Sequence, residues 1–374
     1  MIDSAKKIAI VVSSLSGGGA EKASANLSIV LRKLNCEVHM ISILDKIDFQ
    51  YAGKLLNLGK FKDIHGSILG KFKRFLIFKR YLREEKFNLI IDSRSRPTFI
   101  KEFLIQILLY NNQNVIYIIH SYFVKNYLPE NKFLANLLYR KAHSMVAVSE
   151  EIKEFIDSKY KLKRLQTVHN CIVSPKDTTS QKGFQILPKK FILFFGRIED
   201  KVKNISLLIE SYAASQLASK DIYLVILGNG PDVEKLKHQV KLTHVKAKVV
   251  FIPFQANPIA IVKKAFFSVL SSRYEGSPMS LVESLALGVP VVSVDCKSGP
   301  REIINSGFNG LLVENHNPMA MAKAFDLMVE DKKLYKECCN NASMSVQKFS
   351  VSNISKVWKP LLTTDLNQVL KAVK

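Results

Sequence analysis

The sequence of 374 residues predicts an α/β protein built from two doubly wound domains. Near-continuous apolar runs, such as 191–195 and 265–272, are typical of parallel strands that are covered on both faces. The first apolar run, Lys7 to Ser13, leads into a glycine-rich turn, a helical segment and a second strand at 38–44. That order opens a doubly wound domain. The same order of strand, glycine turn and helix occurs again in the other half of the chain.

The two halves are separated by 174–190, a polar segment without apolar periodicity, which we interpret as a linker. We therefore expect one domain over 1–173 and another over 191–355. The tail 356–374 contains Trp358, the one tryptophan of the chain. We expect this tail to be helical.

Charge and cysteine content limit the class of protein. The formal net charge is +23, which favours a polyanionic partner such as nucleic acid, an acidic membrane surface or a phosphate-bearing substrate. The five cysteines are scattered, without a pattern typical of zinc ligands, as expected for a reduced cytoplasmic protein. We identify no signal peptide and no uninterrupted apolar run of ~18 residues. The expectation is a soluble or peripheral protein.

The most basic tract is Lys54 to Lys86, with ten lysines and arginines against three acidic residues and many apolar residues between them. Residues 70–84 are predicted to form a helix with mixed aromatic and basic faces. Such a helix can lie on an anionic bilayer. The alternative is that the aromatic side chains face the core and the lysines are merely solvated, which leaves the charge surplus unexplained.

In the first half, strands expected at 88–92 and 115–119 end in polar residues, the second in His120. Ligands of α/β sheets bind at the carboxyl ends of strands, so His120 is a candidate site residue. The glycines at 17–19 do not make a dinucleotide fingerprint, because Lys22 stands where the third glycine belongs.

The densest polar pattern follows the apolar run 265–272. Ser277 is predicted to be the N-cap and Pro278 the first residue of a helix that Gly288 ends. The N-terminus of such a helix suits an anion, and a diphosphate would fit there. Glu275 and Glu283 flank this point and could accept hydrogen bonds from hydroxyls on either side.

This stretch, with Glu275-Gly276-x-Pro278-x4-Glu283, Ala-Leu-Gly-Val-Pro-Val-Val and Ser298-Gly299-Pro300-Arg301-Glu302, closely resembles the retaining glycosyltransferases of family 4. The resemblance implies the GT-B fold, with two Rossmann-like domains facing across a cleft. It also implies that the C-terminal tail 356–374 crosses back onto the first domain. It implies that Glu275 and His120 contact the donor sugar, that Glu283 holds the nucleotide ribose and that Glu21 lies toward the acceptor. The remaining donor-binding residues implied by the matching motifs are Gly18, Gly19, Gly230, Gly276, Ser277, Pro278, Met279 and Ser280.

Arg197 and Lys203 match the Gly-Arg…Lys element of that family, and two cations at a strand end can neutralise a diphosphate. The sequence contains no Asp-x-Asp pair, which metal-dependent sugar transferases commonly present. We therefore expect catalysis by Arg197, Lys203, Glu275 and His120, with no metal and no cofactor other than the nucleotide-sugar co-substrate.

The predicted reaction moves a hexose or N-acetylhexosamine, with retention, from a nucleoside diphosphate sugar to a glycan or lipid-linked acceptor of the bacterial envelope. A UDP-sugar is favoured, and GDP-mannose is the alternative donor. The expected location is the cytoplasm, peripheral on an anionic inner membrane face. Two other classes stay open: a basic nucleic-acid- or membrane-binding protein, and a GT-B nucleotide-binding protein without transferase activity. Nucleic acid is not expected as a partner, because no nucleic-acid-binding motif occurs.

Overall fold

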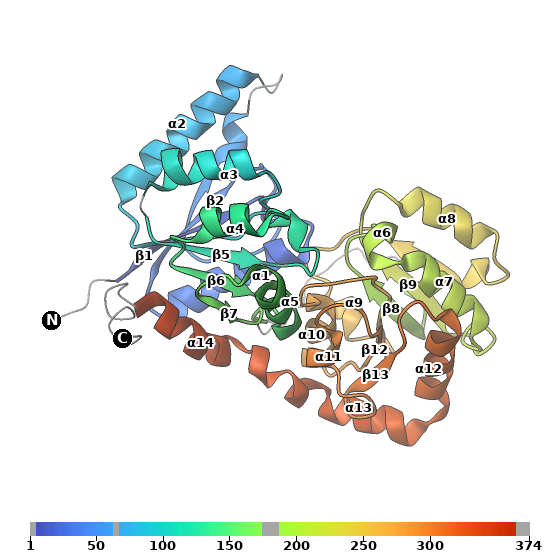
Figure 1. Ribbon diagram of the computed structural model, residues 1–374. Coiled ribbons are helices and arrows are strands. Elements are labelled where there is room, and N and C mark those ends of the chain that lie inside the picture. Colours follow the sequence, from blue (N-terminus) through green and yellow to red (C-terminus); the bar gives the residue numbers. More distant parts are fainter. Residues whose placement is uncertain (1–4, 63–66, 112, 174–186, 364–374) are drawn as a thin grey trace. The chain divides into compact units, whose positions relative to one another are not determined.

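The computed structural model describes residues 5–62, 67–111, 113–173 and 187–363 (Figure 1). The chain divides into two compact units. The first takes Met1–Ser16, Ala20–Cys171 and Val351–Lys374, and the second takes Gly17–Gly19 and Ile172–Ser350. Most of the expected linker 174–190 and the end of the tail, 364–374, lie outside the described residues.

The first unit is built on a seven-stranded parallel sheet in the order β3-β2-β1-β4-β5-β6-β7. The strands are β1 Lys7–Val12, β2 Glu37–Ser42, β3 Lys54–Asn57, β4 Leu89–Asp92, β5 Val115–Ile119, β6 Ser144–Ala147 and β7 Leu165–Thr167. Every residue of β4, β5 and β6 is buried, because helices cover both faces.

The helices of the first unit are α1 Gly19–Lys33, α2 Ile68–Glu85, α3 Phe99–Ile105 with a π-helical turn Gln106–Tyr110, α4 Lys132–Tyr139, α5 Glu150–Tyr160 and α14 Val351–Thr363. Right-handed crossovers place α1 on one face of the sheet and α2 and α3 on the other, because the chain moves in opposite directions along the sheet. Ser149 begins α5 by accepting a hydrogen bond from the Ile152 N–H at 3.3 Å.

The second unit has a six-stranded parallel sheet in the order β10-β9-β8-β11-β12-β13. Its strands are β8 Phe191–Phe195, β9 Tyr223–Leu227, β10 Val249–Ile252, β11 Ser268–Leu270, β12 Val291–Val294 and β13 Gly310–Val313. Its helices are α6 Asp200–Lys203, α7 Ile205–Ala214, α8 Val233–Lys241, α9 Ile259–Val262, α10 Met279–Ala286, α11 Pro300–Ile303, α12 Pro318–Glu330 and α13 Lys332–Ser345.

The predicted α/β class with two parallel sheets is confirmed, but some elements differ. Sequence analysis missed β3, β7 and β13, which are short and lack a long apolar run. A short helix, α6, precedes α7, and Asn204 separates the two with a left-handed φ of 49°.

The helix α14 belongs to the first unit although it follows the second in sequence. Trp358 of this helix is 3% exposed in the core of the first unit, together with Ile354 and Leu361. In the second unit, the Ile172 N–H donates to Phe349 O at 2.8 Å, so the first and last residues of its main segment lie together. Within the described ranges, no helix is both long and apolar enough to cross a membrane.

Candidate active site

The predicted donor-site residues of the second unit gather where the strand order reverses. The chain leaves β8 toward β9 on one side of the sheet and leaves β11 toward β12 on the other, while β8 and β11 are paired neighbours. Ligands of open α/β sheets bind outside the carboxyl ends of strands at such a switch point. The connection after β8 carries Arg197 and Lys203, and the loop after β11 carries Glu275.

Lys203 and Glu275 form an ion pair at this point. Lys203 Nζ lies 2.7 Å from Glu275 Oε1, and Ser272 Oγ donates to the same oxygen at 2.5 Å. The two charged side chains are 22% and 10% exposed. An ammonium group has three N–H donors and a carboxylate has two oxygens. Lys203 can therefore still donate, and Glu275 still accept, further hydrogen bonds. Sequence analysis assigned these residues separate tasks, and the structure brings them into contact.

Arg197 is the exposed cation of the site. Its Nε lies 3.1 Å from Glu199 Oε2, and its side chain is 59% exposed. A long guanidinium with this exposure is held weakly, because surface ion pairs contribute little. Arg197 is therefore placed at the switch point but is not held there as firmly as Lys203.

Two glycines allow the turn after β9 to lie against the turn after β8. A Cβ atom on Gly228 would lie 1.8 Å from Gly196 O, and one on Gly230 would lie 1.9 Å from Ile198 O. Hydrogen bonds join the same two turns, from Ile198 N–H to Asn229 O at 2.9 Å and from Gly196 N–H to Leu227 O at 3.0 Å. The requirement for glycine here comes from backbone packing below the site.

The start of α10 differs from the prediction. Pro278 is the N-cap, with φ −69° and ψ 99°, and the helix begins at Met279. Ser277 is therefore not the N-cap, and Pro278 is not the first helical residue. Proline has no side-chain acceptor, and α10 has no side-chain cap hydrogen bond. The helix thus begins without the side-chain oxygen that usually occupies its N-terminal N–H groups, which suits an external anion.

A second loop supports the start of α10, and sequence analysis assigned it no role. Ser298 Oγ donates to Gly276 O at 3.0 Å, and Ser298 is fully buried. Gly299 has φ +100°, and a Cβ atom there would lie 2.6 Å from Pro278 Cδ. The close approach to Pro278 therefore requires glycine. The Ser298-Gly299-Pro300-Arg301 motif in the sequence could have indicated that this loop has a structural role.

The remaining predicted residues lie along α10. Gly276, Pro278 and Met279 are buried, so Met279 can offer its backbone N–H more readily than its side chain. Ser280 and Glu283 are partly buried on the first and second turns. Gly288 ends the helix with φ +79°, as predicted.

In the first unit, a chain of hydrogen bonds leads to His120. Ser93 follows β4, His120 follows the neighbouring β5, and Ser24 lies on α1. Ser93 Oγ lies 2.6 Å from His120 Nε2 and 2.6 Å from Ser24 Oγ, which donates to Ala20 O at 2.8 Å. Sequence analysis found His120 but neither serine.

The direction of these hydrogen bonds determines the tautomer of His120. Each hydroxyl has one proton. Ser24 uses its proton on a backbone carbonyl, so it accepts from Ser93, and Ser93 in turn accepts from His120 Nε2–H. The other ring nitrogen, Nδ1, is then an acceptor, and it is buried without a hydrogen-bond partner among the described residues. The neutral ring thus has a defined donor side and a defined acceptor side.

Burial, and secondarily the positive charge of Arg96, lower the pKa of His120 to about 3. Arg96 is 1% exposed and donates to Arg94 O at 2.6 Å and to Ile118 O at 3.0 Å. Its guanidinium also lies 5.1 Å from the ring centre of Tyr117. Arg96 therefore ties the β4 loop to β5 and keeps His120 neutral near pH 7.

A buried ionic network lies around the same strand ends. Arg94 donates hydrogen bonds to both carboxylate oxygens of Asp92, at 3.0 and 2.6 Å, and to Glu102 Oε2 at 3.0 Å. Burial alone raises the pKa of the Asp92 carboxyl, but the charges of Arg94 and Arg96 outweigh it and hold that pKa below its usual value. Burial raises the pKa of Glu102. Sequence analysis treated this segment only as a strand-end loop.

A cavity of about 20 Å³ lies beside His120, which is room for one water molecule. Ligand pockets span roughly 300–1,000 Å³, so this cavity is too small for a sugar. Its lining comes from α1, β5, the ends of β6 and β7, and α14, and includes Ser24, Leu27, His120, Val148, His169, Asn170 and Trp358.

The glycine loop before α1 was predicted to face the donor, and Glu21 the acceptor. Gly18 lies just before the helix, which begins at Gly19, and Glu21 is in its first turn. By their contacts Gly18 and Gly19 are grouped with the second unit and Glu21 with the first. Glu21 is only partly buried.

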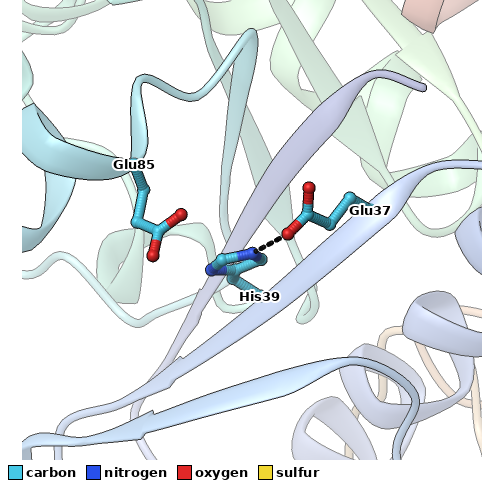
Figure 2. Close-up of side chains that lie close together, drawn as sticks. All are labelled: Glu37, His39 and Glu85. Carbon is cyan, nitrogen blue, oxygen red and sulfur yellow. Dashed lines mark hydrogen bonds and ion pairs between the residues drawn. The ribbon is translucent and has the colours of Figure 1, made fainter. Parts of the chain in front are cut away.

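Figure 2 shows a separate cluster of Glu37, His39 and Glu85, whose possible ligand atoms lie within 4.8 Å of one another. His39 Nε2 lies 3.0 Å from Glu37 Oε1, and Glu85 Oε2 lies 2.8 Å from Lys7 Nζ. Hydrogen bonds from His39 and Lys54 lower the pKa of Glu37 to about 2. The cluster begins at the amino end of β2, the edge opposite the predicted site, and its charges are already balanced by lysines.

Two family models together match nearly all of the chain. The model described as Glycosyltransferase Family 4 matches residues 17–174, and the model described as Glycosyl transferases group 1 matches residues 175–344.

Individual proteins show the same similarity. The chain is 31% identical over 370 residues to an N-acetylgalactosamine-N,N'-diacetylbacillosaminyl-diphospho-undecaprenol 4-alpha-N-acetylgalactosaminyltransferase of Campylobacter jejuni, covering 94% of this chain and 98% of the relative. It is 27% identical to a lipopolysaccharide 1,6-galactosyltransferase of Salmonella typhimurium, covering 82% and 85%. A structure of a Staphylococcus aureus TarM mutant with UDP, Fondaparinux and alpha-GlcNAc-glycerol has a TM-score of 0.77 at 16% identity, covering 96% of this chain and 100% of that one.

Proposed function

Because the chain belongs to the family 4 glycosyltransferases and has the GT-B fold, we propose that it transfers a hexose or N-acetylhexosamine from a UDP-sugar, with retention, to a lipid-linked glycan of the bacterial envelope. The family and fold expected from the sequence are confirmed by the family matches and the structural similarity. The donor, the stereochemistry and the acceptor are the proposal.

The observation that carries the proposal is the Lys203–Glu275 pair beside the uncapped start of α10. A departing UDP gains negative charge at its diphosphate. Lys203 and the N–H groups that begin α10 stabilise that charge, and Arg197 adds a mobile second cation. Fixed donors of this kind can supply the largest single catalytic contribution. These groups serve in place of a metal ion in the proposed mechanism, and no other cofactor takes part.

The carboxylates act on hydroxyl groups. Glu275 is held by Lys203 and Ser272 through one oxygen, so its second oxygen can accept a hydrogen bond from a sugar hydroxyl. Glu283, one turn into α10, accepts from the ribose. His120 is neutral and has a fixed tautomer, so it orients the sugar by hydrogen bonding and does not act as a cation. Glu21 lies toward the acceptor.

A UDP-sugar and a lipid-linked acceptor are favoured by different relatives. The TarM structure contains UDP, and the Campylobacter jejuni relative is named for a diphospho-undecaprenol substrate. A net charge of +23 suits an acceptor that carries a diphosphate at an anionic membrane surface. We propose that the protein works as a peripheral protein on the inner membrane face.

A thermal-shift screen with UDP, GDP, ADP and dTDP tests the nucleotide site. We expect UDP to raise the melting temperature of the wild type and of Glu234→Ala, a control on the exposed face of α8. We expect no such rise in Glu283→Ala. Stabilisation by GDP instead would point to GDP-mannose, and stabilisation by no nucleotide would refute the transferase proposal.

Turnover separates a transferase from a protein that only binds nucleotide. Radiolabelled UDP-hexoses and UDP-N-acetylhexosamines are offered with diphospho-polyprenol-linked acceptors, and the anomeric configuration of the product is read by NMR. Nucleotide binding without transfer to any of these acceptors would support the non-catalytic alternative. An inverted product would refute retention.

A further inference from the structure

The helix α2 carries an exposed apolar stripe. Leu69, Phe72 and Leu76 are 80%, 58% and 47% exposed. Their spacing of three and four residues places them on one side of the helix. The core side is formed by Phe78 and Leu82, which are 5% and 4% exposed. The aromatic and aliphatic residues of this tract are therefore divided between the core and the surface.

A second exposed stripe lies on α3 and the π-helical turn that follows it. Ile100, Leu104, Ile107 and Leu108 are 69%, 48%, 52% and 45% exposed. They recur at intervals of three to four residues, with Ile107 and Leu108 side by side. Contiguous exposed patches of large apolar side chains are rare on soluble proteins and mark protein or membrane interaction sites.

The two stripes belong to one helical layer of the first unit. The chain runs from β3 through α2 to β4 and then through α3 to β5 in the same direction along the sheet, so both crossovers lie on the same face. α2 also contacts the π-helical turn, and Figure 1 shows α2 and α3 close together. We call the seven residues the α2–α3 apolar surface: Leu69, Phe72, Leu76, Ile100, Leu104, Ile107 and Leu108.

Positive charge accompanies this surface. The exposed basic residues of the two helices are Lys71, Lys73, Lys79, Arg80, Arg83 and Lys101. Lys79, Arg80 and Arg83 continue the stripe of α2 toward its C-terminus, at helical spacing from Leu76. The exposed acidic residue Glu84 lies 3.8 Å from Arg80, so it offsets only part of the charge.

We propose that the α2–α3 apolar surface and its flanking lysines and arginines dock the first unit on an anionic lipid bilayer. Exposed leucine, isoleucine and phenylalanine side chains enter the boundary between headgroups and acyl chains, and the basic side chains bind the lipid phosphates. The inner leaflet supplies both an apolar interior and a negative surface potential, which together match this composition.

Other binding partners would satisfy either the positive charge or the apolar side chains of this surface, but not both. A nucleic acid would satisfy the lysines and arginines but not seven exposed apolar side chains. A second copy of the chain would cover the apolar residues but would bring two cationic surfaces together. A bilayer with acidic headgroups satisfies both features.

The inference rests on the proposed function only for its purpose, since docking would bring the enzyme to a lipid-linked acceptor. The lipid contact itself depends on the surface residues alone. The test can therefore fail or succeed independently of the nucleotide assay.

Vesicle co-sedimentation tests the docking. The full chain is mixed with vesicles of phosphatidylcholine alone or with about 30% phosphatidylglycerol. We expect binding to the anionic vesicles, weakened by added salt. The triple variant Leu69→Gln, Phe72→Gln, Leu76→Gln should bind them at least ~tenfold more weakly, because the inserted apolar area is removed.

A matched control uses three apolar residues of similar exposure in the second unit. Leu242, Met344 and Leu327 are 77%, 62% and 44% exposed. Replacing all three with glutamine should leave vesicle binding unchanged. An equal loss in this control, or unchanged binding in the α2 variant, would overturn the proposal.

Charge is tested in the same way. The triple variant Lys73→Gln, Lys79→Gln, Arg83→Gln should lose about tenfold or more in binding to anionic vesicles. Lysines of the second unit provide the charge control, as Lys241→Gln, Lys246→Gln, Lys323→Gln. Equal losses in the two variants, or equal wild-type binding to vesicles of phosphatidylcholine alone, would refute a specific anionic docking surface.

Two further measurements separate docking from the transferase reaction. The α2 variants should keep the UDP-induced thermal shift and their transfer to a short, water-soluble acceptor, while losing transfer to an acceptor in vesicles. If the wild type binds vesicles but no nucleotide, the proposed function fails and the docking inference stands. RNA that displaces the wild type from vesicles, and that binds the apolar α2 variant as tightly as the wild type but the Lys73, Lys79, Arg83 variant more weakly, would favour a nucleic-acid surface instead.

Discussion

The carboxyl ends of the two sheets present their polar residues in different ways. In the first unit, His120 is neutral and lies within a buried network of serines, arginines and carboxylates. In the second, Lys203 and Glu275 are charged, partly exposed and supported by backbone turns. The first arrangement holds one orientation of a neutral ring, and the second holds charges where a diphosphate can approach. We therefore expect the network of the first unit to matter mainly for stability and the ion pair of the second to matter mainly for the proposed transfer.

The largest expected effect is on the buried network. Arg96→Ala removes one of the two cations beside Asp92 and leaves the buried backbone carbonyls of Arg94 and Ile118 without this donor. Such a loss typically costs about 3–5 kcal/mol of unfolding free energy. Denaturant titration of the first unit's transition measures this loss. Arg80→Ala, which removes an exposed pair with Glu84, is the control and should change stability by less than ~0.5 kcal/mol. Similar costs for the two variants would contradict the distinction between them.

The ion pair should affect rate more than stability. Lys203→Ala removes a fixed donor to the leaving diphosphate, so we expect kcat to fall by ~10²–10³-fold. The melting temperature should fall less than in Arg96→Ala, because Lys203 is 22% exposed whereas Arg96 is 1% exposed. Steady-state kinetics with the donor identified by the screen measures the effect. A large loss of stability with an unchanged kcat would reverse the roles assigned to the two units.

The next largest effect is expected from the backbone packing below the site of the second unit. Gly230→Ala puts a Cβ atom against Ile198 O, and the forced shift should cost ~1–3 kcal/mol. Gly307→Ala is a useful comparison, since a Cβ atom there meets nothing within 4 Å although φ is +84°. Chemical denaturation measures both. If Gly230→Ala is no worse than Gly307→Ala, close backbone approach is not the reason for glycine at this turn.

Acid should weaken the first unit through His120. Its folded pKa is lowered to about 3 from an ordinary value of 6.5, so between these values the unfolded chain binds more protons. Stability is fully present above pH 6.5 and is lost as the pH falls toward 3, by at most ~1.4 kcal/mol per pH unit. His120→Asn should reduce this slope in urea titrations at pH 7, 6 and 5. An unchanged slope would mean that other groups control the acid sensitivity.

The smallest expected effect concerns Ser93. Ser93→Ala removes the acceptor for His120 Nε2–H and should cost about 1 kcal/mol of stability. Nitrogen-15 NMR of the imidazole should show the Nε2–H tautomer in the wild type and a mixture in the variant. Ser158→Ala, on the exposed side of α5, controls for loss of a hydroxyl. A wild-type spectrum of the Nδ1–H tautomer would disprove the hydrogen-bond direction assigned here.

Local patterns predicted much of this molecule. The apolar runs of β1, β5 and β8 are continuous and are bounded by turn residues, and the glycine after α10 ends the helix as expected. The candidate residues at strand ends could be found because parallel strands bring their carboxyl ends to one edge. The short β3, β7 and β13 were missed because three or four residues carry too little periodicity.

The sequence by itself determined the two-sheet α/β class, the place of the site residues at strand ends and the basic, apolar composition of α2, because each depends on residue type and local spacing. Only the tertiary structure decided that Lys203 pairs with Glu275 and that Ser24 and Ser93 orient His120. The same holds for which apolar residues of α2 face outward. These features join residues that are far apart in the chain, and nothing in local spacing encodes the distance between them.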